Sequence, residues 1–271
     1  MNPNKELWEK GDFTKLAKTM RESSAAIIHS LNIKPGMEVL DVGCGDGDTA
    51  IPAAKLGANV TGVDISSRLV KAANLRAKEE GVAENCKIIE GDAMELKDQQ
   101  DESFDFVISV FGAMFAPRPN DVAKQLVRVT KKGGQIIMGN WIPGDPTLVA
   151  QILKICAAYT PPPPDGFISP MLWGVEEKVV ERFQNAGIPV ANIDCQKETF
   201  TFIADYPPSI FLSNFRNYYG PTMNAFEAAE KNGRAEELQN ELQTLFNSQN
   251  KSEDKNKLFI PVNFMRVTVM C

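Results

Sequence analysis

The stretch VLDVGCGDGD at residues 39–48 decides the fold class. An apolar run that starts at Met37 ends in three closely spaced glycines, and a helical pattern over residues 49–56 follows them. Glycine suits such a turn because it takes backbone angles that other residues avoid and because a ligand can approach its backbone closely. A strand, a glycine turn and a helix in this order indicate an open α/β sheet, in which ligands lie at the carboxyl ends of the strands.

The sequence around this stretch alternates short apolar runs with helical spacing. Further strands are predicted at residues 59–63, 87–90, 104–110 and 135–139, further helices at 66–80 and 121–130, and a turn at 131–134. Nearly all-apolar strands that alternate with helices are typical of a parallel sheet covered on both faces. The pattern therefore predicts a doubly wound, Rossmann-like, mostly parallel seven-stranded sheet.

The two ends of the chain follow a different pattern. An amphipathic helix is predicted over residues 14–31, a helix over 175–185, strands over 197–203 and 262–270, and a helical region over 209–247 that breaks at 220–221. The four prolines at 161–164 predict an extended surface turn. We expect three parts: a helical lid (1–33), a main domain (34–204 with 258–271), and a helical cap (205–257) inserted between the last two strands.

The ligand of the glycine turn can be a dinucleotide or an adenosyl compound. The dinucleotide pattern G-x-G-x-x-G requires a third glycine where this chain has Asp48. Asp41, Asp46 and Asp48 would repel a pyrophosphate at the helix N-terminus, whereas they suit a cationic sulfonium and amino group. Asp64 directly follows the strand at 59–63 and can accept from both ribose hydroxyls. Asp92 follows the next strand and can accept from the adenine amino group. These charges favour S-adenosylmethionine over NAD.

The motifs DVGCGDGD, GVD, GDAM, FDFVISVFG and KKGG stand in the order that class I S-adenosylmethionine-dependent methyltransferases show. The chain resembles this family over about residues 34–140. Through FGAMFAP, GNWIPGDP, LWGVEE, ETFTF and NYYGP it is similar, over nearly its whole length, to a bacterial small-molecule methyltransferase subfamily whose acceptor is unassigned.

This resemblance implies cofactor-binding roles for eleven residues. Asp41, Gly43, Cys44 and Gly45 would surround the methionine part, Asp64 and Ile65 would hold ribose and adenine, and Asp92 and Ala93 would hold adenine. Ser109 and Phe111 would face the methionyl end, and Trp8 lies in a segment that often covers the cofactor.

No catalytic base is evident in the sequence. The only histidine, His29, precedes the sheet, and no cluster suggests a bound metal. Trp141, Tyr218 and Tyr219 are candidates for the acceptor side, although each could equally be a packing residue. The chain also lacks the Asn- or Asp-Pro-Pro-aromatic motif and the Pro-Cys pair of DNA-methylating branches. We therefore expect positioning and desolvation to dominate catalysis.

Composition narrows the remaining function classes. The net charge is −6 and no basic stripe is present, which disfavours a nucleic-acid partner. No apolar run is long enough for a membrane span, the N-terminus is polar, and five widely spaced cysteines suggest reduced thiols, so we expect a cytoplasmic protein. A small-molecule methyltransferase is the main hypothesis. The alternatives are a quinone-type C-methyltransferase, a non-catalytic S-adenosylmethionine or S-adenosylhomocysteine-binding protein, and a nicotinamide oxidoreductase. The oligomeric state is left open.

Overall fold

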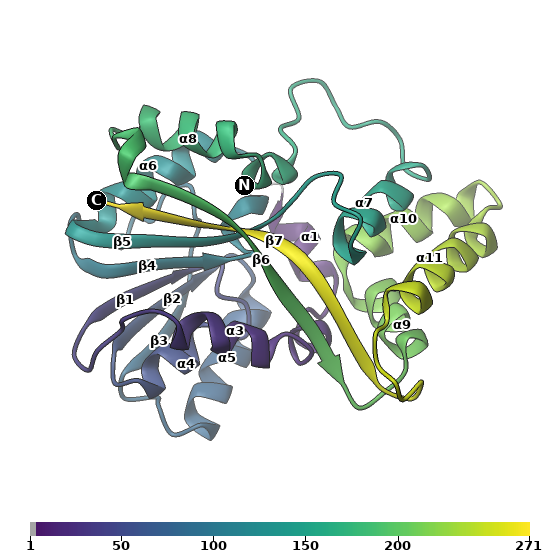
Figure 1. Ribbon diagram of the computed structural model, residues 1–271, viewed down its shortest axis with the longest axis horizontal. Coiled ribbons are helices and arrows are strands. Elements are labelled where there is room, and N and C mark those ends of the chain that lie inside the picture. Colours follow the sequence, from purple (N-terminus) through teal and green to yellow (C-terminus); the bar gives the residue numbers. More distant parts are fainter. Residues whose placement is uncertain (1–3) are drawn as a thin grey trace.

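The computed structural model describes residues 4–271, and its core is a seven-stranded sheet (Figure 1). The strands are β1 (Glu38–Val42), β2 (Asn59–Asp64), β3 (Cys86–Glu90), β4 (Phe104–Val110), β5 (Thr130–Trp141), β6 (Ile193–Ala204) and β7 (Leu258–Met270). Their spatial order is β3-β2-β1-β4-β5-β7-β6. The first five are parallel, whereas β7 runs antiparallel between β5 and β6. The predicted fold class is confirmed.

Helices cover both faces of the sheet because its strands are apolar on both faces (Figure 1). The helices are α1 (Asn4–Lys10), α2 (Thr14–Ala17), α3 (Arg21–His29), α4 (Ala50–Lys55), α5 (Ser67–Glu79), α6 (Pro119–Val129), α7 (Leu148–Ala157), α8 (Glu176–Asn185), α9 (Pro208–Tyr218), α10 (Gly220–Lys231) and α11 (Ala235–Gln249). Successive strand residues alternate between faces. Val39, Ile108 and Ile137 pack with α3, α4 and α5, and the neighbouring Leu40 and Val107 pack on the side of α6 and α8.

The helical insertion lies where it was expected, between the last two strands. Helices α9, α10 and α11 follow β6 and return the chain to β7, with α10 and α11 packed on α7 and α9 packed on both of them. Figure 1 shows β6 and β7 twisting away from the parallel strands toward these helices. Phe211 and Phe246 are fully buried inside the insertion, so it has an apolar core that is continuous with one face of the sheet.

Two local predictions were wrong. The helix predicted at 14–31 is divided into α2 and α3, because Thr19 leaves the helical pattern: its carbonyl accepts from the N–H of Ile203 on β6 at 2.9 Å. Residues 131–134 are a bulge inside β5 rather than a turn before it. Phe104 pairs with Thr130 but Phe106 pairs with Gln135, and the bulged residues still bond to the end of β7.

The expected division into lid, main domain and cap stays a prediction, and residues 1–3 of the lid lie outside the described residues. Within residues 4–271, no helix combines the length and the apolar character that crossing a membrane requires.

Candidate cofactor site

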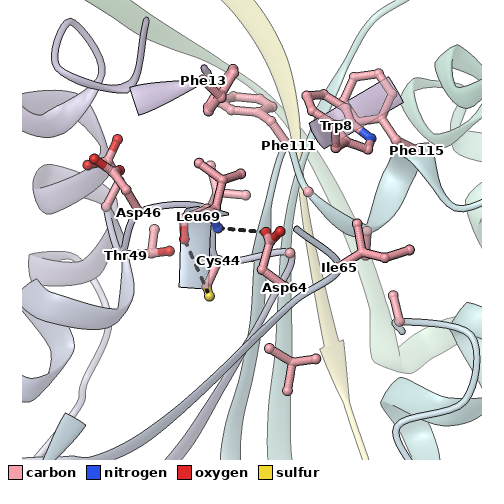
Figure 2. A pocket seen from close by; sticks show the side chains of 18 of the residues that line it. Trp8, Phe13, Cys44, Asp46, Thr49, Asp64, Ile65, Leu69, Phe111 and Phe115 are labelled. Carbon is pink, nitrogen blue, oxygen red and sulfur yellow. Dashed lines mark hydrogen bonds between the residues drawn. The ribbon is translucent and has the colours of Figure 1, made fainter. Parts of the chain in front are cut away.

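A pocket opens at the carboxyl ends of β1, β2 and β4 (Figure 2). Its floor forms where the loops that follow β1 and β4 touch. A side chain on Gly43 would start 2.7 Å from the Cα of Gly112, and one on Gly112 would start 2.3 Å from the Gly43 carbonyl oxygen. Only two glycines allow this approach, so the glycine turn sets how close the two strands' loops come.

The glycine turn exposes its backbone to the pocket. Gly43 and Gly45 have φ values of +70° and +56°, in the left-handed region that favours glycine. A side chain on Gly45 would meet nothing within 4 Å, and Gly45 lines the pocket. A ligand can therefore lie directly against this backbone.

Asp64 ends β2 and faces the middle of the pocket (Figure 2). Its Oδ2 accepts from the N–H of Gly45 at 2.9 Å, and its Oδ1 accepts from the N–H of Ser66 at 2.9 Å. Burial raises the pKa of this carboxyl, although the backbone hydrogen bonds oppose the shift. The two bonds fix the carboxylate in place and leave lone pairs for donors on a ligand.

Ile65, Asp92 and Ala93 line the part of the pocket beyond Asp64. The N–H of Met94 donates to Oδ1 of Asp92 at 2.8 Å. Ile65 lies to one side of Asp64 in Figure 2, opposite Asp46. Two apolar side chains beside one carboxylate suit a flat heterocycle that carries an amino group.

Asp41 and Ser109 lie behind the pocket rather than on its surface. The Thr49 hydroxyl donates to Asp41, and burial raises the pKa of Asp41 to about 7. The Ser109 hydroxyl donates to the carbonyl of Val42 at 2.7 Å and accepts from the N–H of Ala113 at 2.9 Å. Both side chains thus hold the loops in position from below, whereas the other nine expected cofactor contacts line the pocket.

The aspartates of the glycine turn form ion pairs with two arginines, which the sequence did not reveal. Nη1 of Arg76 lies 2.8 Å from Asp48 and 3.5 Å from Asp46, and Nη2 of Arg21 lies 3.2 Å from Asp46. The expectation that these aspartates act as free negative charges toward a ligand is therefore revised. Burial, with the charge of Asp46, raises the pKa of Asp48 to about 7, while the two arginines oppose the shift.

The segment that carries Trp8 and Phe13 covers the pocket and is fastened to α5. Backbone and hydroxyl groups of Ser67 donate to Glu9 at 3.2 and 3.1 Å, and Arg68 donates to the carbonyl of Gly11 at 3.0 Å. The Trp8 and Phe115 rings meet edge to face, with their centroids 5.0 Å apart (Figure 2). These contacts position an aromatic roof over the cavity.

Phe111, directly after β4, has a strained backbone. Its φ is +58°, although it is not glycine, and its N–H donates to the Gly139 carbonyl at 2.9 Å. Its ring stacks on Trp141 with centroids 3.6 Å apart and planes 5° apart. Such strain persists only where the surrounding structure enforces it, and here it presents an aromatic ring to the pocket.

None of the three candidates for the acceptor side reaches the pocket surface. Trp141 lies behind Phe111, and Tyr219 lies behind Trp8 and Phe13, with its ring centroid 6.0 and 6.3 Å from theirs. Tyr218 accepts from the N–H of Asp12 through its carbonyl. Among the lining residues found within 4–271, there is no histidine, lysine, arginine or tyrosine.

Several lining residues were missed in the sequence. Met20 directly precedes α3, Ser24 lies in its first turn, and Leu69 comes from α5. Their helical spacing marks them as buried, but nothing local separates a buried residue that faces a pocket from one that faces the core. The tightly spaced glycines gave the only strong local signal.

Comparison with known proteins agrees with this site. A family model described as a methyltransferase domain matches residues 40–138, which include the glycine turn, Asp64 and Asp92. An uncharacterised protein of Mycobacterium tuberculosis is 31% identical over 226 residues, covering 83% of this chain and 80% of that protein. The chain belongs to the class I S-adenosylmethionine-dependent methyltransferases. Its cofactor is S-adenosylmethionine, and the expected enzyme class is confirmed.

Two other proteins resemble this methyltransferase to different extents. YcgJ of Bacillus subtilis has a solved structure that is similar with a TM-score of 0.58 at 18% identity, covering 91% of this chain and 97% of that one, which shows the common fold. A sterol 24-C-methyltransferase of Gibberella zeae is 38% identical over 120 residues, but these are 44% of this chain and 31% of that enzyme.

Proposed function

We propose that this methyltransferase transfers the methyl group to a small-molecule acceptor, mainly by positioning the reactants and excluding water. When bound, S-adenosylmethionine supplies an already activated methyl group, which an acceptor atom takes by in-line displacement. The protein must then align the two reactants and keep water away from them.

The cofactor contacts follow from the pocket geometry. Asp64 accepts the ribose hydroxyls, Asp92 accepts the adenine amino group, and Ile65 and Ala93 enclose the adenine ring. The backbone of Gly43 and Gly45, with Cys44, surrounds the methionine part. Asp41 and Ser109 act indirectly by holding these loops, and Trp8 closes the site. The open face of Gly45 is consistent with a ligand that lies against this loop.

The observation that supports catalysis by positioning is the chemistry of the pocket wall. Its titratable side chains are four aspartates and Cys44. Asp46 and Asp48 are paired with arginines, and Asp64 and Asp92 accept backbone N–H groups. Burial raises the pKa of the Cys44 thiol, which keeps it protonated. We assign Asp48 a structural role because Arg76 already occupies its Oδ1.

The reaction is tested with S-adenosylmethionine labelled in its methyl group and a bacterial extract. The proposal predicts that label enters the small-molecule fraction in step with release of S-adenosylhomocysteine. Label in protein or nucleic acid would contradict a small-molecule acceptor, and no release at all would contradict turnover.

The cofactor contacts are tested with S-inosylhomocysteine, which lacks the adenine amino group. The native protein should prefer S-adenosylhomocysteine by tenfold or more, as expected for a hydrogen bond to a charged group. Asp92→Ala should lose this preference, and Asp64→Ala should keep it while binding both ligands more weakly. A preference that survives in Asp92→Ala would contradict the adenine assignment.

A further inference from the structure

Phe13, Met20, Ser24 and Phe111 all line the pocket, and the family resemblance places Phe111 at the methionyl end of the cofactor. We call the part that these four residues line the upper chamber. Figure 2 shows Phe13 and Phe111 next to each other at the upper end of the pocket, above Leu69 and Cys44. We propose that the upper chamber receives a neutral, largely apolar acceptor that carries one hydrogen-bonding group. This inference rests on the proposed function and specifies its substrate class.

The walls of the upper chamber are apolar and come from three separate parts of the fold. Phe13 belongs to the covering segment, Met20 precedes α3, and Phe111 follows β4. Strand β6 links two of these parts, because Ile203 donates to the carbonyl of Thr19, next to Met20, and the Phe200 ring lies with its centroid 5.1 Å from that of Phe111. The strained φ of Phe111 and its stack on Trp141 fix the ring at this place. Apolar walls select ligands by the area they bury.

The nearest charges favour a neutral molecule over an ion. Asp46 and Asp48 line the pocket, but Arg21 and Arg76 pair with both carboxyl groups, so neither is a free charge toward the acceptor. Within the described residues, no cation lines the pocket to receive a carboxylate or a phosphate. An unpaired ion would lose its hydration in the chamber without gaining a partner.

One polar group in the chamber has its bonding capacity unused. Ser24 is 1% exposed and lines the pocket, and its hydroxyl makes no hydrogen bond within residues 4–271. The Thr49 hydroxyl, by contrast, is committed to Asp41. Because Ser24 lines the pocket, a ligand that brings one donor or acceptor to its hydroxyl gains a hydrogen bond. The acceptor therefore carries a hydroxyl, carbonyl or comparable group on an apolar frame.

The test uses straight-chain alcohols as probes, titrated calorimetrically into protein saturated with S-adenosylhomocysteine. From 1-hexanol to 1-octanol the affinity should rise about fourfold with each added methylene, as expected for burial of apolar area. Octanoate and octylammonium should bind at least 100-fold more weakly than 1-octanol, because each buries an unpaired charge.

Variants locate the binding. Ser24→Ala should weaken 1-octanol about tenfold, and by more than it weakens S-adenosylhomocysteine. Phe13→Leu serves as a second, conservative change of the wall and should lower the gain per methylene. Phe167→Ala is the matched control, because Phe167 is 56% exposed and lies outside the pocket, and it should change nothing.

Each result decides the inference. Octanoate that binds within tenfold of 1-octanol, or 1-octanol that does not bind to the S-adenosylhomocysteine complex, would overturn it while leaving the proposed function intact. An affinity for 1-octanol that Ser24→Ala does not change would overturn the role of Ser24. Failure to bind S-adenosylhomocysteine would instead overturn the proposed function, and this inference with it.

Discussion

Substituting Gly43 by alanine tests the contact between the loops after β1 and β4. Gly43 has a φ of +70°, and a β-carbon there would lie 2.7 Å from the Cα of Gly112, a distance that packed atoms do not reach. The left-handed backbone costs a non-glycine residue about 1–2 kcal/mol. Forcing apart two backbone segments adds about 1–3 kcal/mol. Gly43→Ala should therefore lower the free energy of unfolding by about 2–5 kcal/mol.

Gly81 provides the matched control for this substitution. Its φ is +73°, nearly that of Gly43, but a side chain there would meet nothing within 4 Å. Gly81→Ala should cost only the backbone part, about 1–2 kcal/mol. Urea denaturation of both variants, followed by circular dichroism, measures the difference. Equal losses would show that the two loops do not approach as closely as the geometry indicates.

Two further predictions concern the buried charges. Arg76→Ala leaves the Asp46 and Asp48 carboxylates partly unpaired and should lower the free energy of unfolding, measured by urea denaturation, by about 3–5 kcal/mol. The control Arg118→Ala removes an exposed ion pair with Asp121 and should lower it by at most about 1 kcal/mol. Similar losses in the two variants would contradict the buried ion-pair network. Asp41 has its pKa raised to about 7 by burial, so its contribution to stability is fully present below about pH 4 and is lost as the pH rises toward and through 7. Asp41→Asn should remove this part of the decline between pH 4 and 7.5, and an unchanged slope of stability against pH would contradict it.

The sequence predicted the parts of the structure that depend on local pattern. The run from Val39 to Val42 and its glycines mark β1 and the cofactor turn because apolar spacing and glycine conformation are both local properties. The same holds for Ser66, which caps α5 with its side chain, and for Asp64 at the end of β2.

Properties that depend on distant partners were not predictable. The charges of Asp46 and Asp48 are compensated by Arg21 and Arg76, which lie 25 to 30 residues away in the sequence, so the acidic turn looks unpaired when read alone. The strained φ of Phe111 is likewise enforced from outside, by Gly139 and Trp141 on β5. The bulge at 131–134 depends on pairing with the end of β7, which local glycine content does not reveal.

The cofactor site itself is tested most directly by calorimetric titration of the native protein and of Asp64→Ala with S-adenosylmethionine, S-adenosylhomocysteine and NAD. The native protein should bind both adenosyl ligands at one site and should not bind NAD. Because Asp64 would accept two hydroxyl hydrogen bonds through a charged group, Asp64→Ala should weaken both adenosyl ligands by about 10²- to 10⁴-fold. Binding of NAD in place of the adenosyl ligands, or adenosyl affinity that Asp64→Ala does not change, would contradict the assignment of this pocket as the S-adenosylmethionine site.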